Sequence, residues 1–177
     1  MELKESTFKD LFKEDLEKKK QYVRDVTIDT DVEMLIPDEY VSNIQERLNL
    51  YTGLNKIDTE EGIDTFKKSL IDRFGKMPKV VNALFDGLRL RWICKELGFE
   101  RVILKNGKLR CYFVENPQSP YYESPTFQQI FQFIATQGHK HHLSVKKSTR
   151  HLILVRDGIR SLGKARGILQ EIEKGIS

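Results

Sequence analysis

Near its C-terminus the sequence contains a partial match to the motif of a phosphate-binding loop. Gly158 is followed, after four residues, by Gly163 and Lys164, and the stretch joins a strand-like run to a helix-like one. Ala165 stands where such a loop needs a Ser or Thr hydroxyl for Mg²⁺, and the 12 residues after it are too few for another strand with a metal-binding Asp. We therefore expect no nucleotide site here, and at most weak anion binding at the helix N-terminus.

Four histidines gather in the same half of the chain. His139, His141 and His142 lie in the run GHKHH, and His151 lies on the next predicted strand. Zinc takes about four ligands, or three with an open position, and no Cys or acidic residue stands close in sequence to complete such a set. His141 and His142 would also point to opposite faces of a strand. We interpret the run as a polar turn without metal.

Nothing else in the sequence predicts catalysis or a cofactor. Cys94 and Cys111 are far apart in apolar surroundings, without the C-x-x-C spacing of metal or redox sites, so we expect buried, reduced thiols. There is no Gly-x-Ser-x-Gly elbow, no cysteine with an evident histidine partner, and no carboxylate pair in an apolar setting. We expect no catalytic, cofactor-binding or metal-binding residue, and no enzyme activity of this chain alone.

The stretch SLIDRFGKMP carries a different candidate, an exposed charge pair. A helix that ends at its glycine would turn three apolar residues inward: Leu70, Ile71 and Phe74. Ser69, Asp72 and Arg73 would then lie outside. One interpretation is a solvated helix end, whose exposed ion pair contributes only about 0 to 1 kcal/mol. The other is a charged surface that a partner protein contacts.

Composition places these candidates in one folded domain with an uneven charge. The chain has 177 residues, 39% of them apolar, which suffices for a single core. No run reaches the roughly 20 apolar residues that span a bilayer, and no signal peptide is evident, so we expect a cytoplasmic protein. Up to position 98 there are 17 basic and 20 acidic residues, and after it 13 and 6, so the halves carry −3 and +7. The basic half leaves a nucleic-acid-binding module open as an alternative function.

The apolar pattern predicts an α+β fold, with N-terminal helices followed by a small antiparallel sheet with a hairpin and two further helices. Residues 6–23 are predicted to form a narrow amphipathic helix, either a solvated leader or a connecting helix cut from a longer chain. Residues 26–36 alternate like a strand, closed by Pro37. Helices are then expected from Asp38 to Gly53, from Asp58 or Thr59 to Gly75, and from about Pro78 to Gly98. The first of these would turn one apolar side inward: Tyr40, Val41, Ile44, Leu48 and Tyr51.

After Gly98 the apolar period changes to two. The segment RVILKNGKLRCYF predicts two strands joined by Asn106-Gly107 in a type I′ hairpin. The remaining elements are a helix from Ser124-Pro125 to Gly138, strands in HLSVKK and HLILVRD, and a last helix from about Ser161.

Four segments resemble a known family in their order and spacing. EMLIPDEYV, ERLNLY, LIDRFGKMP and KELGFERV occur as in the C-terminal domain of the bacterial transcription-repair coupling factors, and the resemblance covers about residues 25–170. Six of the residues that carry it are interpreted as structural: Pro37, Tyr40, Arg47, Tyr51, Phe74 and Gly75.

The resemblance implies that this chain is part of a longer protein. Members of the family are ATP-driven double-stranded DNA translocases that push stalled RNA polymerase off lesions and recruit UvrA through an N-terminal module similar to UvrB. Their C-terminal domain docks on that module and hides the UvrA-binding surface until polymerase is engaged. Residues 1–24 would be the connecting helix from the upstream motor. Residues 25–177 would be the regulatory domain, a monomer that needs no cofactor and contacts no membrane.

The resemblance also implies a docking contact at the helix that ends in D-R-F-G. Its acidic member carries over to Asp72, which would face basic residues of the UvrB-like module, with Arg73 beside it. The position three residues earlier is often acidic in the family but is Ser69 here. This departure would shift part of the contact to neighbours such as Asp64 or Lys68.

Overall fold

The computed structural model describes residues 21–177. The predicted helix of residues 6–23 and the proposed connecting segment of residues 1–24 lie mostly outside this part. Its strands are β1 (Thr27–Thr30), β2 (Phe99–Lys105), β3 (Lys108–Phe113), β4 (Ser144–Lys147) and β5 (Leu152–Asp157). Its helices are α2 (Ile44–Asn55), α3 (Glu60–Phe74), α4 (Asn82–Leu97), α5 (Pro125–Gln137) and α6 (Leu162–Ile176). None of the helices in residues 21–177 is both long and apolar enough to cross a bilayer.

The five strands form one mixed sheet in the order β1-β2-β3-β5-β4. The pairs β2–β3, β3–β5 and β4–β5 are antiparallel, which confirms the predicted α+β class and hairpin. Asn106 and Gly107 make the hairpin turn, with φ of 53° and 72°. Strand β1 adds a parallel neighbour to β2, because α2, α3 and α4 intervene and return the chain in the same direction.

The prediction of a strand over residues 26–36 is correct only for its first half, because β1 spans Thr27–Thr30 and the rest is not a strand. Strand β1 ends at Thr30, whose hydroxyl accepts a hydrogen bond from the Val32 amide at 3.0 Å and donates one to the Leu104 carbonyl at 2.8 Å. This local turn competes with the sheet ladder. Ile36 is nevertheless buried, at 2% exposure, so the apolar residues after β1 still pack although they no longer pair.

Helix α2 begins six residues later than predicted and passes its expected stop. The amides of Tyr40 and Val41 donate to the Pro37 carbonyl at 3.0 and 3.1 Å, which folds the preceding segment into a turn. The Asn43 side chain then accepts from the Glu46 amide at 2.9 Å and caps the helix. The other helices end where predicted: Thr59 and Gly75 bound α3, Gly98 ends α4, Ser124 and Gly138 bound α5, and Ser161 caps α6.

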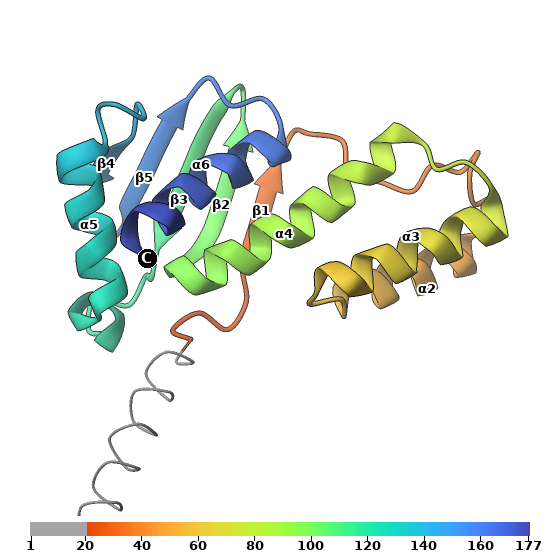
Figure 1. The fold of residues 1–177 in the computed structure, drawn as a ribbon, viewed down its shortest axis with the longest axis horizontal. Helices are drawn as coiled ribbons and strands as arrows, with labels where there is room; N and C mark the ends of the chain where they lie inside the picture. The colour runs from red at the N-terminus through yellow and green to blue at the C-terminus, as the bar shows by residue number, and fades with distance from the viewer. Residues whose placement is uncertain (1–20) are drawn as a thin grey trace, which may run out of the picture.

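Two apolar cores share helix α4. The larger core joins one face of the sheet to α5, α6 and the second half of α4, where Leu90 and Leu97 are buried. The smaller core joins α2 and α3 to the first half of α4 through Phe85 and Leu88. In Figure 1, α4 and α6 lie in front of the sheet, while α2 and α3 form a pair on the right, beside the first half of α4. Helix α4 therefore connects the sheet to the helical pair.

Candidate functional site

All five residues of the predicted contact surface lie exposed on α3. Its inward stripe consists of Ile63, Phe66, Leu70 and Phe74, of which Ile63 and Leu70 are fully buried. The outward positions fall on two neighbouring stripes, the first with Asp64, Lys68 and Asp72 at intervals of four, and the second with Ser69 and Arg73. We call these five residues the α3 surface. The helix thus presents acidic and basic groups together on one side.

Within the α3 surface the two members of the charge pair have different surroundings. Arg73 forms an ion pair with Glu46 of α2, and its guanidinium lies 4.8 Å from the centre of the Phe74 ring. The Asp72 carboxylate makes no hydrogen bond or ion pair with any residue in the described part of the chain. The arginine is therefore engaged within the domain, whereas the aspartate is available to a partner.

Three apolar side chains that were predicted to face inward are exposed on α2 and α3. The exposed fractions are 67% for Ile44, 54% for Leu48 and 49% for Ile71. In α2 the side packed in the small core carries Leu50 and Leu54, and Ile44 and Leu48 lie on a different side of the helix that faces solvent. Exposed apolar residues therefore lie on both helices of the pair, in addition to the charges.

Tyr40 fixes the end of α3. Its hydroxyl lies 2.8 Å from the Gly75 carbonyl oxygen and 3.2 Å from that of Leu70, and its ring centre is 5.8 Å from that of Phe74. Partial burial raises the pKa of the Tyr40 phenol above its usual value, so the hydroxyl stays protonated and keeps donating. The D-R-F-G end is thus held by a residue outside the helix.

Helix α2 holds the segment that carries Tyr40. The Arg47 guanidinium donates to the Val41 carbonyl at 2.6 Å and lies 3.4 Å from an Asp38 carboxylate oxygen. The Tyr51 hydroxyl accepts from the Ile36 amide at 2.7 Å. Arg47 and Tyr51, four residues apart, therefore fasten the turn around Pro37 to α2, and through it the end of α3.

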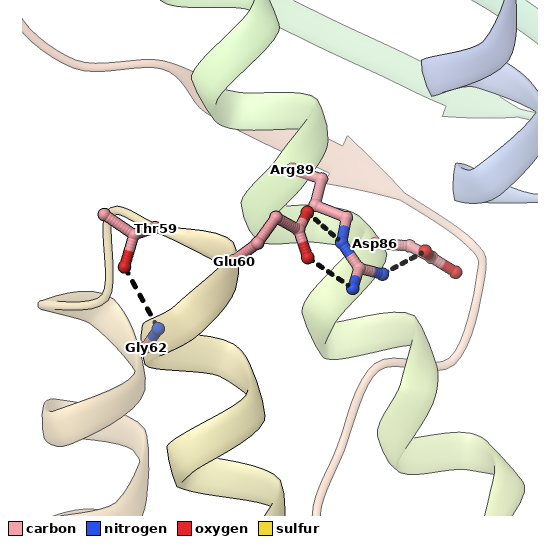
Figure 2. A network of polar contacts seen from close by, with 5 residues as sticks. All are labelled: Thr59, Glu60, Gly62, Asp86 and Arg89. Atoms are coloured by element: carbon pink, nitrogen blue, oxygen red, sulfur yellow. Dashed lines mark hydrogen bonds and ion pairs between the residues drawn. The ribbon is translucent and has the colours of Figure 1, made fainter.

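A second anchor at the other end of α3 has no counterpart in the sequence prediction. Figure 2 shows the Arg89 guanidinium of α4 donating to both carboxylate oxygens of Glu60, at 2.7 and 2.9 Å, and to Asp86 at 3.4 Å. The hydrogen bond from Arg89 lowers the pKa of Glu60, and Glu60 in turn raises that of Arg89. Thr59 caps the same helix end by accepting from the Gly62 amide at 3.0 Å. The spacing of three residues between Asp86 and Arg89 is a local signal for an ion pair within α4. The sequence contains no local signal for the pairing of Arg89 with Glu60 of α3.

The groups that resemble catalytic motifs lie elsewhere. Ser161 caps α6 in the loop-like stretch after Gly158, accepting from the Lys164 amide at 3.1 Å. Within residues 21–177 no group of three His, Cys, Asp or Glu side chains could hold a metal ion. Cys94 and Cys111 are free thiols in the large core, and burial raises both pKa values, that of Cys111 to about 12.

A wide groove lies between α5 and the β4–β5 hairpin, with a volume of about 1000 Å³. Tyr122, Phe131 and Leu152 contribute apolar surface, while Glu100 and Arg150 contribute opposite charges. This groove was not predictable from the sequence, since its walls come from five separate segments. Its mixed lining indicates no particular ligand.

The family model described as the TRCF domain matches residues 30–124, more than half of the chain. Curated relatives named transcription-repair-coupling factor are also similar. The Rickettsia conorii protein is 34% identical over 76 residues, which are 43% of this chain and 7% of the relative. The Escherichia coli protein is 34% identical over 77 residues, 41% of this chain and 7% of the relative. The Staphylococcus haemolyticus protein is 24% identical over 132 residues, 75% of this chain and 11% of the relative.

Among solved structures, the crystal structure of the C-terminal domain of a transcription-repair coupling factor has the same fold. The TM-score is 0.63 at 20% identity, over 86% of this chain and 92% of that chain. The chain accordingly corresponds in fold to nearly all of that domain, while it spans about 7% of the length of the first two relatives named above.

Proposed function

Because the chain belongs to the TRCF domain family, we propose that it is a regulatory docking domain of a transcription-repair coupling factor. In this proposal it docks through the α3 surface on a UvrB-like module of the same protein and masks the surface that binds UvrA. The longer protein would be an ATP-driven DNA translocase that acts on stalled RNA polymerase. The domain itself would supply no catalytic group.

The availability of Asp72 is the observation that carries the proposal. Arg73 is occupied by Glu46, so the α3 surface offers the unpaired carboxylate of Asp72 to a basic partner. Tyr40 at one end and Arg89 at the other hold α3 in place, and such a preorganised surface loses little entropy on docking. The exposed Ile44, Leu48 and Ile71 provide apolar area on the same helical pair.

The regulatory contact must be weak enough to open. A coupling free energy of about 1–3 kcal/mol would lower UvrA affinity roughly 5- to 150-fold, and a few desolvated charge pairs around Asp72 could supply it. Ser69 removes one acidic group that the resemblance implies, so Asp64 and Lys68 are expected to contribute at the edge of the contact.

Calorimetric titration of this chain into the isolated UvrB-like module tests the proposal, with UvrA as competitor. We expect binding that UvrA displaces and that Asp72→Arg abolishes. Glu171→Arg, an equal charge change at an exposed position of α6, is the matched control and should bind normally. In the full-length protein Asp72→Ala should raise UvrA affinity while the melting temperature of the domain stays nearly constant. Equal loss of binding in both charge-reversed variants, or a large loss of stability in Asp72→Ala, would contradict the assignment of the α3 surface.

A further inference from the structure

One face of the sheet carries no helix in the described part of the chain. Side chains alternate along each strand, and those that belong to the large core are buried: Val102, Leu104, Leu109, Cys111 and Leu154. The side chains between them are exposed or half-buried. We call the surface made by six of them the open face: Arg101, Ile103, Arg110, Tyr112, Lys146 and Ile153.

The strand register arranges the open face in two rows. Arg101 pairs with Tyr112, Tyr112 with Ile153, and Ile153 with Lys146, so this row runs across β2, β3, β5 and β4 from one cation to another. Thr27 of β1 continues it beyond Arg101. At about 4.8 Å between strands the part from Arg101 to Lys146 is roughly 14 Å long. In the next row Arg110 lies between Ile103 and Val155. Apolar side chains therefore lie between the two cations of the first row, and the second row carries Arg110 at its centre and Asp29 at its β1 end.

Planar side chains lie together at one end of the first row. The Arg101 guanidinium is 5.5 Å from the centre of the Tyr112 ring. The ring centre of His151 is 5.4 Å from that of Tyr112, at an interplanar angle of 82°. Tyr112 and His151 are half-buried, so their rings are partly accessible. Such exposed rings beside a guanidinium can stack on nucleobases.

The charge of the open face is positive. Arg101, Arg110 and Lys146 form none of the ion pairs found in the described residues. At the margin of this face, Lys105 is neutralised by Asp29 at 3.0 Å. Part of the net charge of +7 in the second half of the sequence therefore lies on this one face of the sheet. A polyanion is the complementary partner.

We propose that the open face binds single-stranded nucleic acid, with bases on Tyr112 and Ile153 and phosphates on Arg101, Arg110 and Lys146. A duplex would offer phosphates but keep its base faces stacked, which leaves Tyr112 and the central aliphatic side chains without partners. This inference concerns a different surface from the α3 surface and does not depend on the docking proposal.

Fluorescence anisotropy with labelled 20-nucleotide single strands of DNA and RNA tests the inference, with a duplex of equal length and polyglutamate as competitors. We expect micromolar binding at low salt that weakens as salt increases. Tyr112→Ala should lower affinity about 5- to 150-fold, the worth of one stacked base, while Tyr112→Phe should keep it. Arg101→Glu with Arg110→Glu should abolish binding. The matched control, Lys164→Glu with Lys174→Glu on exposed positions of α6, should leave most of the affinity.

Three results would overturn the inference. The first is no binding of any single strand at tens of micromolar protein and low salt. The second is equal loss in the open-face and α6 double variants, which would mean attraction by net charge alone. The third is competition by polyglutamate as strong as by single strands, with no effect of Tyr112→Ala, which would identify an acidic protein as the partner. Thermal unfolding of each variant ensures that the comparison is made between folded proteins.

Discussion

Replacing Gly98 should strongly destabilise the domain. Its backbone conformation is unfavourable for other residues, and the Tyr121 ring fills the space that a side chain would need. It ends α4 in the left-handed conformation, with φ of 94° and ψ of 30°. A Cβ there would lie 2.6 Å from the hydroxyl oxygen of Tyr121 and closer still to its ring. Tyr121 is fully buried and donates to the Leu97 carbonyl at 2.5 Å, so the ring cannot move without losing that hydrogen bond.

Gly98→Ala should therefore reduce the free energy of unfolding by about 2–5 kcal/mol. The left-handed backbone accounts for about 1–2 kcal/mol and the overpacking against Tyr121 for about 1–3 kcal/mol. Gly75→Ala is a comparison without crowding, because Gly75 also has a positive φ, of 86° with a ψ of −161°, but open space where the Cβ would lie. It should cost about 1–3 kcal/mol from the backbone alone. Urea unfolding followed by circular dichroism measures both. If Gly98→Ala costs no more than the left-handed backbone alone, about 1–2 kcal/mol, the packing of Tyr121 against α4 is not as described.

Three further predictions concern the contacts that hold the helices and strands. Arg89→Met should lower the free energy of unfolding by about 1 kcal/mol at pH 7, measured in urea. Because Arg89 lowers the pKa of Glu60, this difference should be present above the ordinary carboxyl pKa and vanish as the pH falls through the folded value; an equal loss at pH 3 would refute the assignment. Tyr121→Phe should cost about 1–3 kcal/mol in the same assay, because the Leu97 carbonyl would lose its donor, and a neutral effect would argue against that bond. Cys111, whose thiol has a pKa of about 12, should react with a disulfide reagent at pH 8 only when urea unfolds the chain.

Local signals in the sequence predicted the elements whose limits are set by a few adjacent residues. Asn106-Gly107 specified the hairpin because a type I′ turn requires positive φ at both positions. Thr59 and Ser161 specified helix starts because their side chains accept from amides three residues on. The exposed position of Asp72 followed from the apolar stripe of α3 alone.

Features that depend on packing between distant segments were not predictable in the same way. Ile44 and Leu48 fit an apolar stripe in the sequence, but packing against the partner helices decides which side of α2 is buried. The parallel pairing of β1 with β2 depends on where the three intervening helices return the chain. The bond between Glu60 and Arg89 requires knowing that α3 packs on α4.

The division of α4 between two cores has a consequence for hydrogen exchange. Phe85 and Leu88 belong to the small core, whereas Leu90 and Leu97 belong to the large one. Helices α2 and α3 can therefore open as one cooperative unit while the sheet and the second half of α4 remain folded. Amides of α3 would then exchange faster than those of β3. A partner bound at α3 would slow the first group selectively, so its footprint could be mapped without a structure of the complex.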